Sequence, residues 1–254
     1  FTYVELIDVT NYLNHYYLVS LLAFLLCFMP LGRTYGLDAR RRPDSALYSV
    51  PAWMVWALRF QISVVYFYAA LAKTGPDWLL HGQPMGLWLH ARTDIPLIGS
   101  LFALPSVPLV MSWAGFLYDL SVPFAMLWSR TRPYAFIVAI GFHTMVGVLF
   151  NIGMFPWIML ASLTVFFSPA WPRRWVKLPH PKVQQSPNSP VKYGRLTASL
   201  VGVTLLFQAI WPARAYAYEG DVMWHEQGMR FSWKVMVREK NGSVMYRVKS
   251  QRWQ

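Results

Sequence analysis

Ionisable side chains inside long apolar runs are the residues of this sequence most able to do chemistry. The run 51–74 contains Arg59, Tyr66 and Lys73 at intervals of seven residues, which places all three on one face of a helix. A charged group in the hydrocarbon layer costs about 2.5 to 3.5 kcal/mol, so each one needs a partner or a function. We expect this helix face to look into a helical bundle.

Arg59 has an expected partner in another apolar run. It lies about eight residues from the start of its run, and Asp119 lies about nine residues from the end of the run 106–128. At about 1.5 Å of rise per residue the two side chains have a similar depth. We therefore predict a buried ion pair between Arg59 and Asp119, with a structural role.

Lys73 lies at the outer end of the run 51–74, and two interpretations of it stay open. In the structural one, its side chain reaches the membrane surface and pairs with Asp77, four residues later. In the functional one, loss of hydration makes an uncharged amine easier to maintain, so that Lys73 can accept a proton as a general base.

Further polar residues gather at the outer ends of the neighbouring runs. Asn14 and His15 open the first run, His143 lies in the outer half of the fourth, and Asn151 follows that run. Each histidine alone is what a helical bundle commonly buries. Together with Lys73, these residues predict a polar binding pocket on one side of the membrane.

The composition predicts a protein embedded in the lipid bilayer. Its 254 residues are 56% hydrophobic and only 13% charged, whereas soluble domains are about 25% charged. Several apolar runs approach the length of a membrane-spanning helix, about 20 residues. The predicted spans are residues 14–31, 51–74, 106–128, 133–150, 154–167 and 196–212. The fold class is therefore mainly α, a polytopic transmembrane helical bundle.

The charge pattern predicts the orientation of the bundle. The net charge of +12 comes mostly from basic loops and the C-terminal segment rather than from one soluble face, so nucleic acid is not an expected partner. The loops after the first, third and fifth spans are rich in Lys and Arg and are predicted to be cytoplasmic. The outer pocket then faces the opposite, non-cytoplasmic compartment. The single cysteine, Cys27, excludes an internal disulfide and a thiolate metal site, and no metal-binding motif is present.

The chain divides into four predicted parts. Residues 1–167 form a transmembrane helical domain, 168–195 a cytoplasmic basic proline-rich linker, and 196–212 the last transmembrane helix. Residues 213–254 are predicted to be the N-terminal part of a β domain in the lumen or periplasm. The chain starts without methionine and ends with SQRWQ, so we expect a longer parent protein.

The β domain is predicted from the alternation of apolar and polar residues around Asn241-Gly242. This dipeptide is a frequent two-residue hairpin turn. Pairing across it would set Val237 opposite Tyr246 and Val235 opposite Val248. We expect this domain to cover the outer pocket.

The residues resemble the vitamin K-dependent gamma-glutamyl carboxylases and their bacterial relatives with an HTTM domain. The resemblance extends over nearly the whole chain. The segments that carry it are YLNHYYLVSLLAFLL from Tyr12, LRFQISVVYFYAALAKTGPDW from Leu58, FLYDLSVPF from Phe116, FHTMVGVLFNIGMFPWIMLAS from Phe142, SPAWPRRW from Ser168 and EGDVMWHEQGMRFSWKVMV from Glu219.

The resemblance implies a lyase that carries out peptidyl-glutamic acid carboxylation. Lys73 would be the base that deprotonates vitamin K hydroquinone or a related quinol, Asn14 and His15 would belong to the quinone site, and His143 matches a family position. O2 and CO2 would be consumed, and a glutamate-containing peptide or protein would be the substrate. The family's usual glycine in the lysine segment is Ala70 here.

Two other functions are compatible with the same residues. One is a non-catalytic or quinone-binding membrane module of the same fold. The other is a transporter, in which the interruption at residues 151–153 would line a pathway. Epoxide formation, quinone binding without turnover and uptake into liposomes would separate the three.

Overall fold

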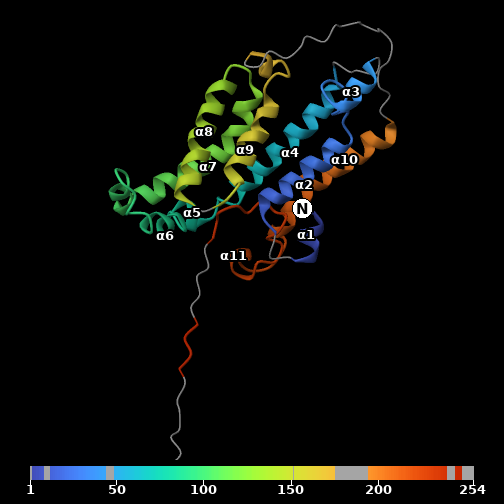
Figure 1. Cartoon of the computed structure of the whole chain (residues 1–254). Helices are drawn as coiled ribbons and strands as arrows, with labels where there is room; N and C mark the ends of the chain where they lie inside the picture. The colour runs from blue at the N-terminus through green and yellow to red at the C-terminus, as the bar shows by residue number, and fades with distance from the viewer. Residues whose placement is uncertain are drawn as a thin grey trace, which may run out of the picture.

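The fold is a helical bundle, seen in a computed structural model that describes residues 2–8, 12–43, 49–150, 152–174, 194–238 and 244–247 (Figure 1). The apolar helices follow the predicted spans. They are α2 (Asn14–Cys27), α4 (Ala52–Leu71), α7 (Val107–Leu127), α8 (Arg132–Leu149), α9 (Phe155–Leu163), which continues as the 3-10 turn η4 (Thr164–Phe166), and α10 (Arg195–Ile210), which continues as η6 (Trp211–Tyr216). The prediction of a mainly α bundle is confirmed.

Four of these helices are long and apolar enough to cross a membrane. They are α4, α7, α8 and α10 with η6. α2 and the α9–η4 helix are apolar but shorter, so their length alone does not establish that they cross. α4 is the most buried of the four long helices, and it packs against α2, α7 and α10. It is the element around which the bundle is built.

The short elements gather at the two ends of the bundle. α3 (Leu37–Arg41) and η5 (Trp171–Arg174) lie at one end, whereas α1 (Thr2–Ile7), α5 (Pro76–Leu79), α6 (Met85–His90) and α11 (Val222–His225) lie at the other (Figure 1). α3 carries Arg40 and Arg41 in its last turn. We call these the basic end and the site end.

The first half of α7 is covered by the connection from α4. The indole Nε1 of Trp78 in α5 donates to the carbonyl of Ser112 at 2.7 Å, and Nε1 of Trp113 donates to the carbonyl of Leu79 at 2.9 Å. α6 and η3 (Gly99–Ala103) pack against the same half of α7. α7 therefore extends past the end of α4, and residues in its middle lie level with the residues that follow α4.

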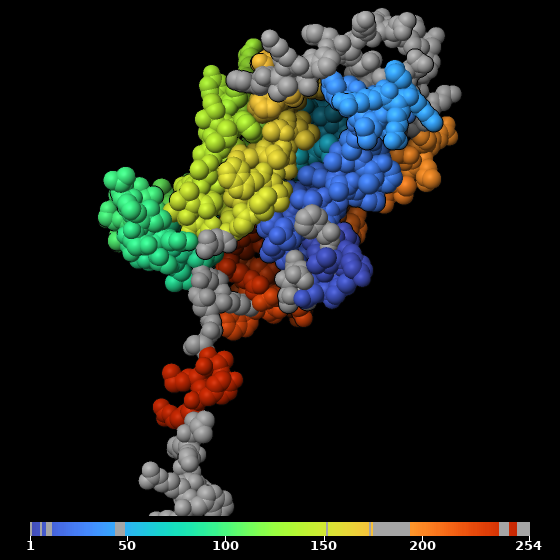
Figure 2. All heavy atoms as spheres, in the orientation of Figure 1, coloured from blue at the N-terminus to red at the C-terminus, as the bar shows by residue number. Residues whose placement is uncertain are grey.

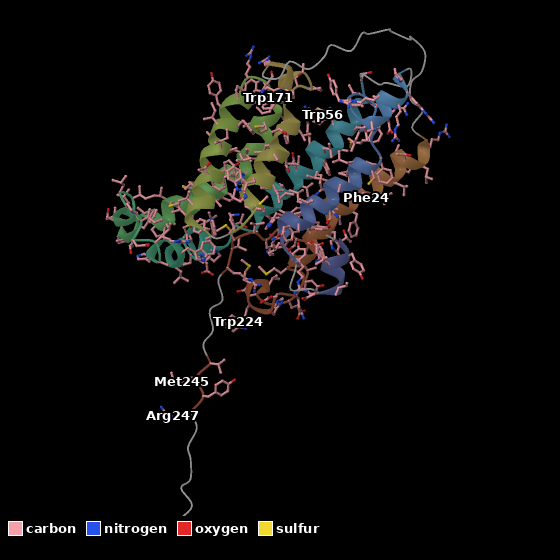
Figure 3. The ribbon with its side chains drawn as sticks, in the orientation of Figure 1. Phe24, Trp56, Trp171, Trp224, Met245 and Arg247 are labelled. Atoms are coloured by element: carbon pink, nitrogen blue, oxygen red, sulfur yellow. The ribbon has the colours of Figure 1, made fainter. Side chains whose placement is uncertain are left out.

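The prediction of a β domain is not supported by the structure. The described residues from 217 to 238 and from 244 to 247 contain α11 and irregular backbone but no strand. Val237 is buried in the body, whereas Tyr246 is 86% exposed, and Figure 3 shows the neighbouring Met245 and Arg247 away from the bundle. The predicted pair of Val237 with Tyr246 is therefore wrong. Asn241, Gly242 and Val248 lie outside the described residues.

Tertiary contacts explain why the alternating pattern does not form a strand here. Residues 226–238, which we call the C-terminal segment, lie at the site end beside the N-terminal helices (Figure 2). Trp233 is fully buried and stacks on Tyr17 of α2, with ring centroids 5.0 Å apart. Phe231, Trp233 and Met236 have φ values of 58°, 57° and 50°, which an extended strand does not allow. Anchoring of the aromatic side chains in the bundle outweighs the strand pattern.

Residues 175–193, which make up most of the predicted cytoplasmic linker, lie outside the described residues.

Candidate functional site

Lys73 lies just after α4 and is buried, with 6% of its surface exposed. Its ammonium Nζ donates to Oδ2 of Asp119 at 2.9 Å, to the carbonyl of Ala69 at 3.2 Å and to the carbonyl of Val235 at 3.4 Å. It also lies 5.3 Å from the centre of the Trp78 ring, a distance at which a cation is attracted to an indole face. All three N–H groups of a protonated lysine thus have acceptors.

The predicted ion pair between Arg59 and Asp119 is wrong, because Asp119 pairs with Lys73. The prediction measured depth from the ends of the apolar runs, but α7 extends past the end of α4. Asp119 in the middle of α7 is therefore level with Lys73, and Asp77 is not the partner of Lys73 either.

Arg59 has carbonyl partners in place of a carboxylate. Its Nε donates to Val165 at 3.1 Å, and its Nη2 donates to Phe166 at 3.1 Å and to Phe167 at 3.4 Å. These carbonyls end the α9–η4 helix, where a cation is favoured by unpaired acceptors and by the helix dipole. The partners of Arg59 are therefore backbone carbonyls and not the predicted carboxylate. Its structural role stays a prediction.

A second polar pair lies close to Lys73. The hydroxyl of Tyr66 in α4 and Nε2 of His143 in α8 are hydrogen-bonded at 3.1 Å, and both residues are buried. Among the described residues Nδ1 of His143 is buried without a hydrogen-bond partner. An unpaired buried polar atom is costly, so this nitrogen is available to a ligand.

The two pairs line one cavity, otherwise enclosed mainly by apolar side chains. Its volume is about 60 Å³, smaller than the several hundred Å³ of most ligand sites. Methionine side chains adapt their shape easily, and five of them lie in this wall: Met85, Met111, Met145, Met159 and Met236. The wall therefore contains several side chains that can change shape around a ligand.

Asn14 and His15 line a neighbouring hollow rather than the cavity itself. This outer hollow has a volume of about 500 Å³ and shares Phe155, Val235 and Met236 with the cavity wall. The ring of Phe155 lies 5.9 Å from that of His15 and 5.8 Å from that of His143. The predicted pocket is thus divided in two by a wall of three residues. Asn151 lies outside the described residues.

A third, polar hollow of about 710 Å³ opens at the site end, between the C-terminal segment and Tyr12. We call it the basic hollow, because its wall includes Arg214, Arg230, Lys234 and Arg238 but, among the described residues, only one carboxylate, Glu226. Glu226 pairs with Arg238. Burial lowers the pKa of Lys234, and nearby Asp221 partly opposes this shift. The basic hollow favours an anionic ligand.

Two family models match the chain. The HTTM domain matches residues 1–171, and the lumenal domain of vitamin K-dependent gamma-carboxylase matches residues 193–254. The chain belongs to the vitamin K-dependent gamma-carboxylase family. The HTTM match covers Lys73, Asp119 and His143, and the lumenal-domain match covers the C-terminal segment. No solved structure matches the chain.

The candidate site of this family member contains two features that sequence reasoning missed. One is the contact of Asp119 with Lys73, in place of the predicted contact with Arg59. The other is the backbone of Val235 and the side chain of Met236. Both belong to the cavity wall, although they lie far from the other wall residues in the sequence. Trp78 could have been noticed, since an indole five residues after a buried lysine suits a cation–π contact.

Proposed function

We propose that the protein acts as a gamma-glutamyl carboxylase-like membrane enzyme. It couples oxidation of vitamin K hydroquinone, or a related quinol, by O2 to the addition of CO2 to the γ-carbon of a peptide glutamate. The products are the quinone epoxide, water and γ-carboxyglutamate. The observation that carries the proposal is the buried Lys73–Asp119 pair in an apolar-walled cavity of a family member.

The residues of the cavity fit a lipid-soluble quinol. The wall is mainly apolar, and its titratable side chains are those of Lys73, Asp119, Tyr66 and His143. Nδ1 of His143 is available to one ligand oxygen. We propose that Lys73 is the base toward a quinol hydroxyl group, and that the apolar wall keeps water from the oxygenated product.

Asn14 and His15 are proposed to contact the same ligand from the outer hollow. Phe155, Val235 and Met236 line both spaces. A ligand with two fused rings needs more than the 60 Å³ of the inner cavity, so rotation of Met236 or Phe155 would join them. The outer hollow then supplies the remaining space.

The basic hollow is the proposed entry for the glutamate-containing substrate. Its cationic side chains attract a carboxylate, and Met236 belongs both to its wall and to the wall of the inner cavity. A glutamate side chain reaching past Met236 would approach the quinol site. This arrangement supports a non-cytoplasmic substrate, because the basic loops lie at the opposite end of the bundle.

The test uses the purified full-length protein in detergent with reduced vitamin K, O2, labelled bicarbonate and a glutamate-rich peptide. We expect both epoxide and labelled peptide from the wild type, and neither from Lys73→Ala. Arg92→Ala, which removes a cation on the connection near α6 but outside the cavity wall, is the matched control and should retain activity.

Two results would change the proposal. Epoxide without labelled peptide would restrict it to quinol oxygenation. Wild-type activity in Lys73→Ala would remove Lys73 as the base.

A further inference from the structure

The protonation of Lys73 raises a chemical problem for any base function. A protonated amine has no lone pair and cannot accept a proton. The geometry around Lys73 is that of the protonated form, because Asp119, Ala69 and Val235 provide one acceptor for each of three N–H groups. A proton must therefore leave Lys73 before Lys73 can act.

We infer that Asp119 is a positioning residue that takes this proton, so that the Lys73–Asp119 pair works as one unit. The inference rests on the proposed function of the site. The N–H bond to Oδ2 breaks and its electron pair stays on Nζ, while an O–H bond forms on Asp119. Lys73 then has a lone pair and can accept a proton from a quinol hydroxyl group, whose oxygen keeps the electron pair of the broken O–H bond.

The surroundings favour transfer within the pair over release of a proton to bulk water. Nζ and Oδ2 are 2.9 Å apart, and the two side chains are only 7% and 9% exposed. The transfer converts an ion pair into two neutral groups without changing the net charge. Neutral groups are favoured when a ligand displaces the last water from an apolar cavity.

The other groups that face the pair are weaker candidates for the proton. From α4 and α7 these are the phenols Tyr66 and Tyr118, and from α8 it is His143, whose Nε2 is bonded to Tyr66. α5 contributes the indole of Trp78, and the C-terminal segment contributes the Val235 carbonyl. Within the described residues, Asp119 is the acidic side chain bonded to Lys73.

The pH dependence of the rate separates this role from the alternatives. In the wild type, the reactive state is the pair with one proton, and it is lost only when acid adds a second proton to the carboxylate. In Asp119→Asn, the reactive state is the free amine of Lys73. This amine takes up a proton at a higher pH than the carboxylate of the wild-type pair does. The acid limb of the pH–rate profile therefore moves to higher pH. For each whole step in pH that the limb moves, the rate at a fixed acidic pH falls about tenfold.

An acid limb that moves to lower pH, or that does not move, would identify a different role for Asp119. If Asp119 only holds Lys73 as an ammonium ion, its removal frees the amine at lower pH, and the acid limb moves down. If Asp119 is only structural, Asp119→Asn loses activity at every pH without moving the limb.

The experiment measures epoxide formation by full-length wild type, Asp119→Asn, Asp119→Glu and Asp77→Asn. The pH runs from about 6 to about 9.5, a range that lies on both sides of neutrality and below the ordinary pKa of lysine. We expect the limb of Asp119→Asn to move upward with recovery at high pH, and that of Asp119→Glu to return partly toward the wild-type position. Asp77→Asn is the control, since this acidic residue lies four positions after Lys73 but outside the cavity wall. An unmoved or downward limb in Asp119→Asn overturns the inference.

A second readout does not depend on turnover. Difference infrared spectra on adding oxidised vitamin K should show a protonated carboxylic acid in the wild type that is absent from Asp119→Asn. Absence of this band in a wild type that binds the quinone overturns the inference, even if Asp119→Asn fails to fold. A wild type that neither binds quinone nor forms epoxide overturns the proposed function and the inference together, whereas epoxide from a wild type without the band overturns the inference alone.

Discussion

At the scale of single residues, two arginines show how this bundle holds cations without carboxylates. Arg59 donates to three carbonyls at the end of the α9–η4 helix, and Arg132 donates to the carbonyls of Met126 at 2.7 Å and Leu127 at 2.9 Å at the end of α7. Each guanidinium satisfies acceptors that the helix end leaves unpaired. A sequence shows the cation, but not whether its partner is a side chain or a helix end.

Arg59→Met should therefore destabilise the protein without affecting the chemistry. Hydrogen bonds to charged groups contribute about 1.5 to 3 kcal/mol, so we expect a loss of about 2 kcal/mol and a lower Tm in detergent. The pH–rate profile should stay in place, because Lys73 follows Arg59 by fourteen positions, about 21 Å at the rise of a helix. Arg59→Lys keeps the charge but fewer donors and should give an intermediate Tm. A moved acid limb in Arg59→Met would contradict this assignment.

Lys234 gives a stability change that depends on pH. Burial lowers its pKa below the ordinary 10.5, partly opposed by Asp221, so the unfolded chain binds more protons in the interval between the lowered value and 10.5. Stability then rises with pH across that interval. At neutral pH the ammonium is charged in both states, and its desolvation cost is fully present.

Lys234→Met removes this cost. We expect the variant to have a higher Tm than wild type at pH 7, and this advantage should shrink as the pH approaches 10.5. The contact of the ammonium with the Tyr216 ring, at 4.4 Å, limits the size of the gain. Thermal unfolding in detergent at several pH values measures it. An advantage that grows with pH would contradict the assigned direction.

At the scale of elements, helices were predictable and their relative depth was not. Apolar runs specify where helices form because the bilayer requires every backbone group to be paired within the segment. The position of α7 depends on two indole hydrogen bonds. Trp78 donates to the carbonyl of Ser112 in α7, and Trp113 in α7 donates to the carbonyl of Leu79. Such contacts leave no periodic pattern. In the C-terminal segment the sequence does have a pattern, the alternation of apolar and polar residues, but no strand forms. Trp233 is buried and anchors this segment in the bundle.

The connection from α8 to α9 offers a test of backbone conformation. Gly153 has a φ of 59°, where any other L residue is strained. Gly153→Ala should therefore lower the unfolding free energy by about 1 kcal/mol, although no other atom lies within 4 Å of the added methyl group. Because this connection places His143 relative to Phe155, the affinity for a quinol should also fall.

The matched control adds the same methyl group to a regular helix. Gly141 in α8 has no neighbouring atom within 4 Å of a new Cβ, and its φ is not positive. Gly141→Ala should leave stability unchanged or slightly higher. Equal destabilisation by both variants in chemical unfolding would show that the backbone at Gly153 is not the cause.

At the scale of the whole molecule, both ends of the bundle carry tryptophans. Trp56 and Trp171 lie near the basic end together with α3, and Trp224 lies at the site end (Figure 3). Tryptophans favour the membrane interfaces, and loops rich in Lys and Arg favour the cytoplasm. The sequence predicts which loops share a side, on the expectation of six alternating spans. It could not place Asp119 beside Lys73, because that contact depends on the register of α7.

Topology is therefore the last prediction. Each reporter is placed in a Cys27→Ala background: Arg41→Cys in α3 at the basic end, and Asp94→Cys near α6 and Trp224→Cys in α11 at the site end. All three positions are exposed, so a membrane-impermeant maleimide can reach them if they face outward. On intact cells we expect labelling of Asp94→Cys and Trp224→Cys, and labelling of Arg41→Cys only after permeabilisation. Labelling of Arg41→Cys on intact cells would indicate the opposite orientation, with Lys73 on the cytoplasmic side, away from secreted substrates. Labelling of Asp94→Cys without Trp224→Cys would break the alternation of spans, since α11 and α6 could then not share one end of the bundle.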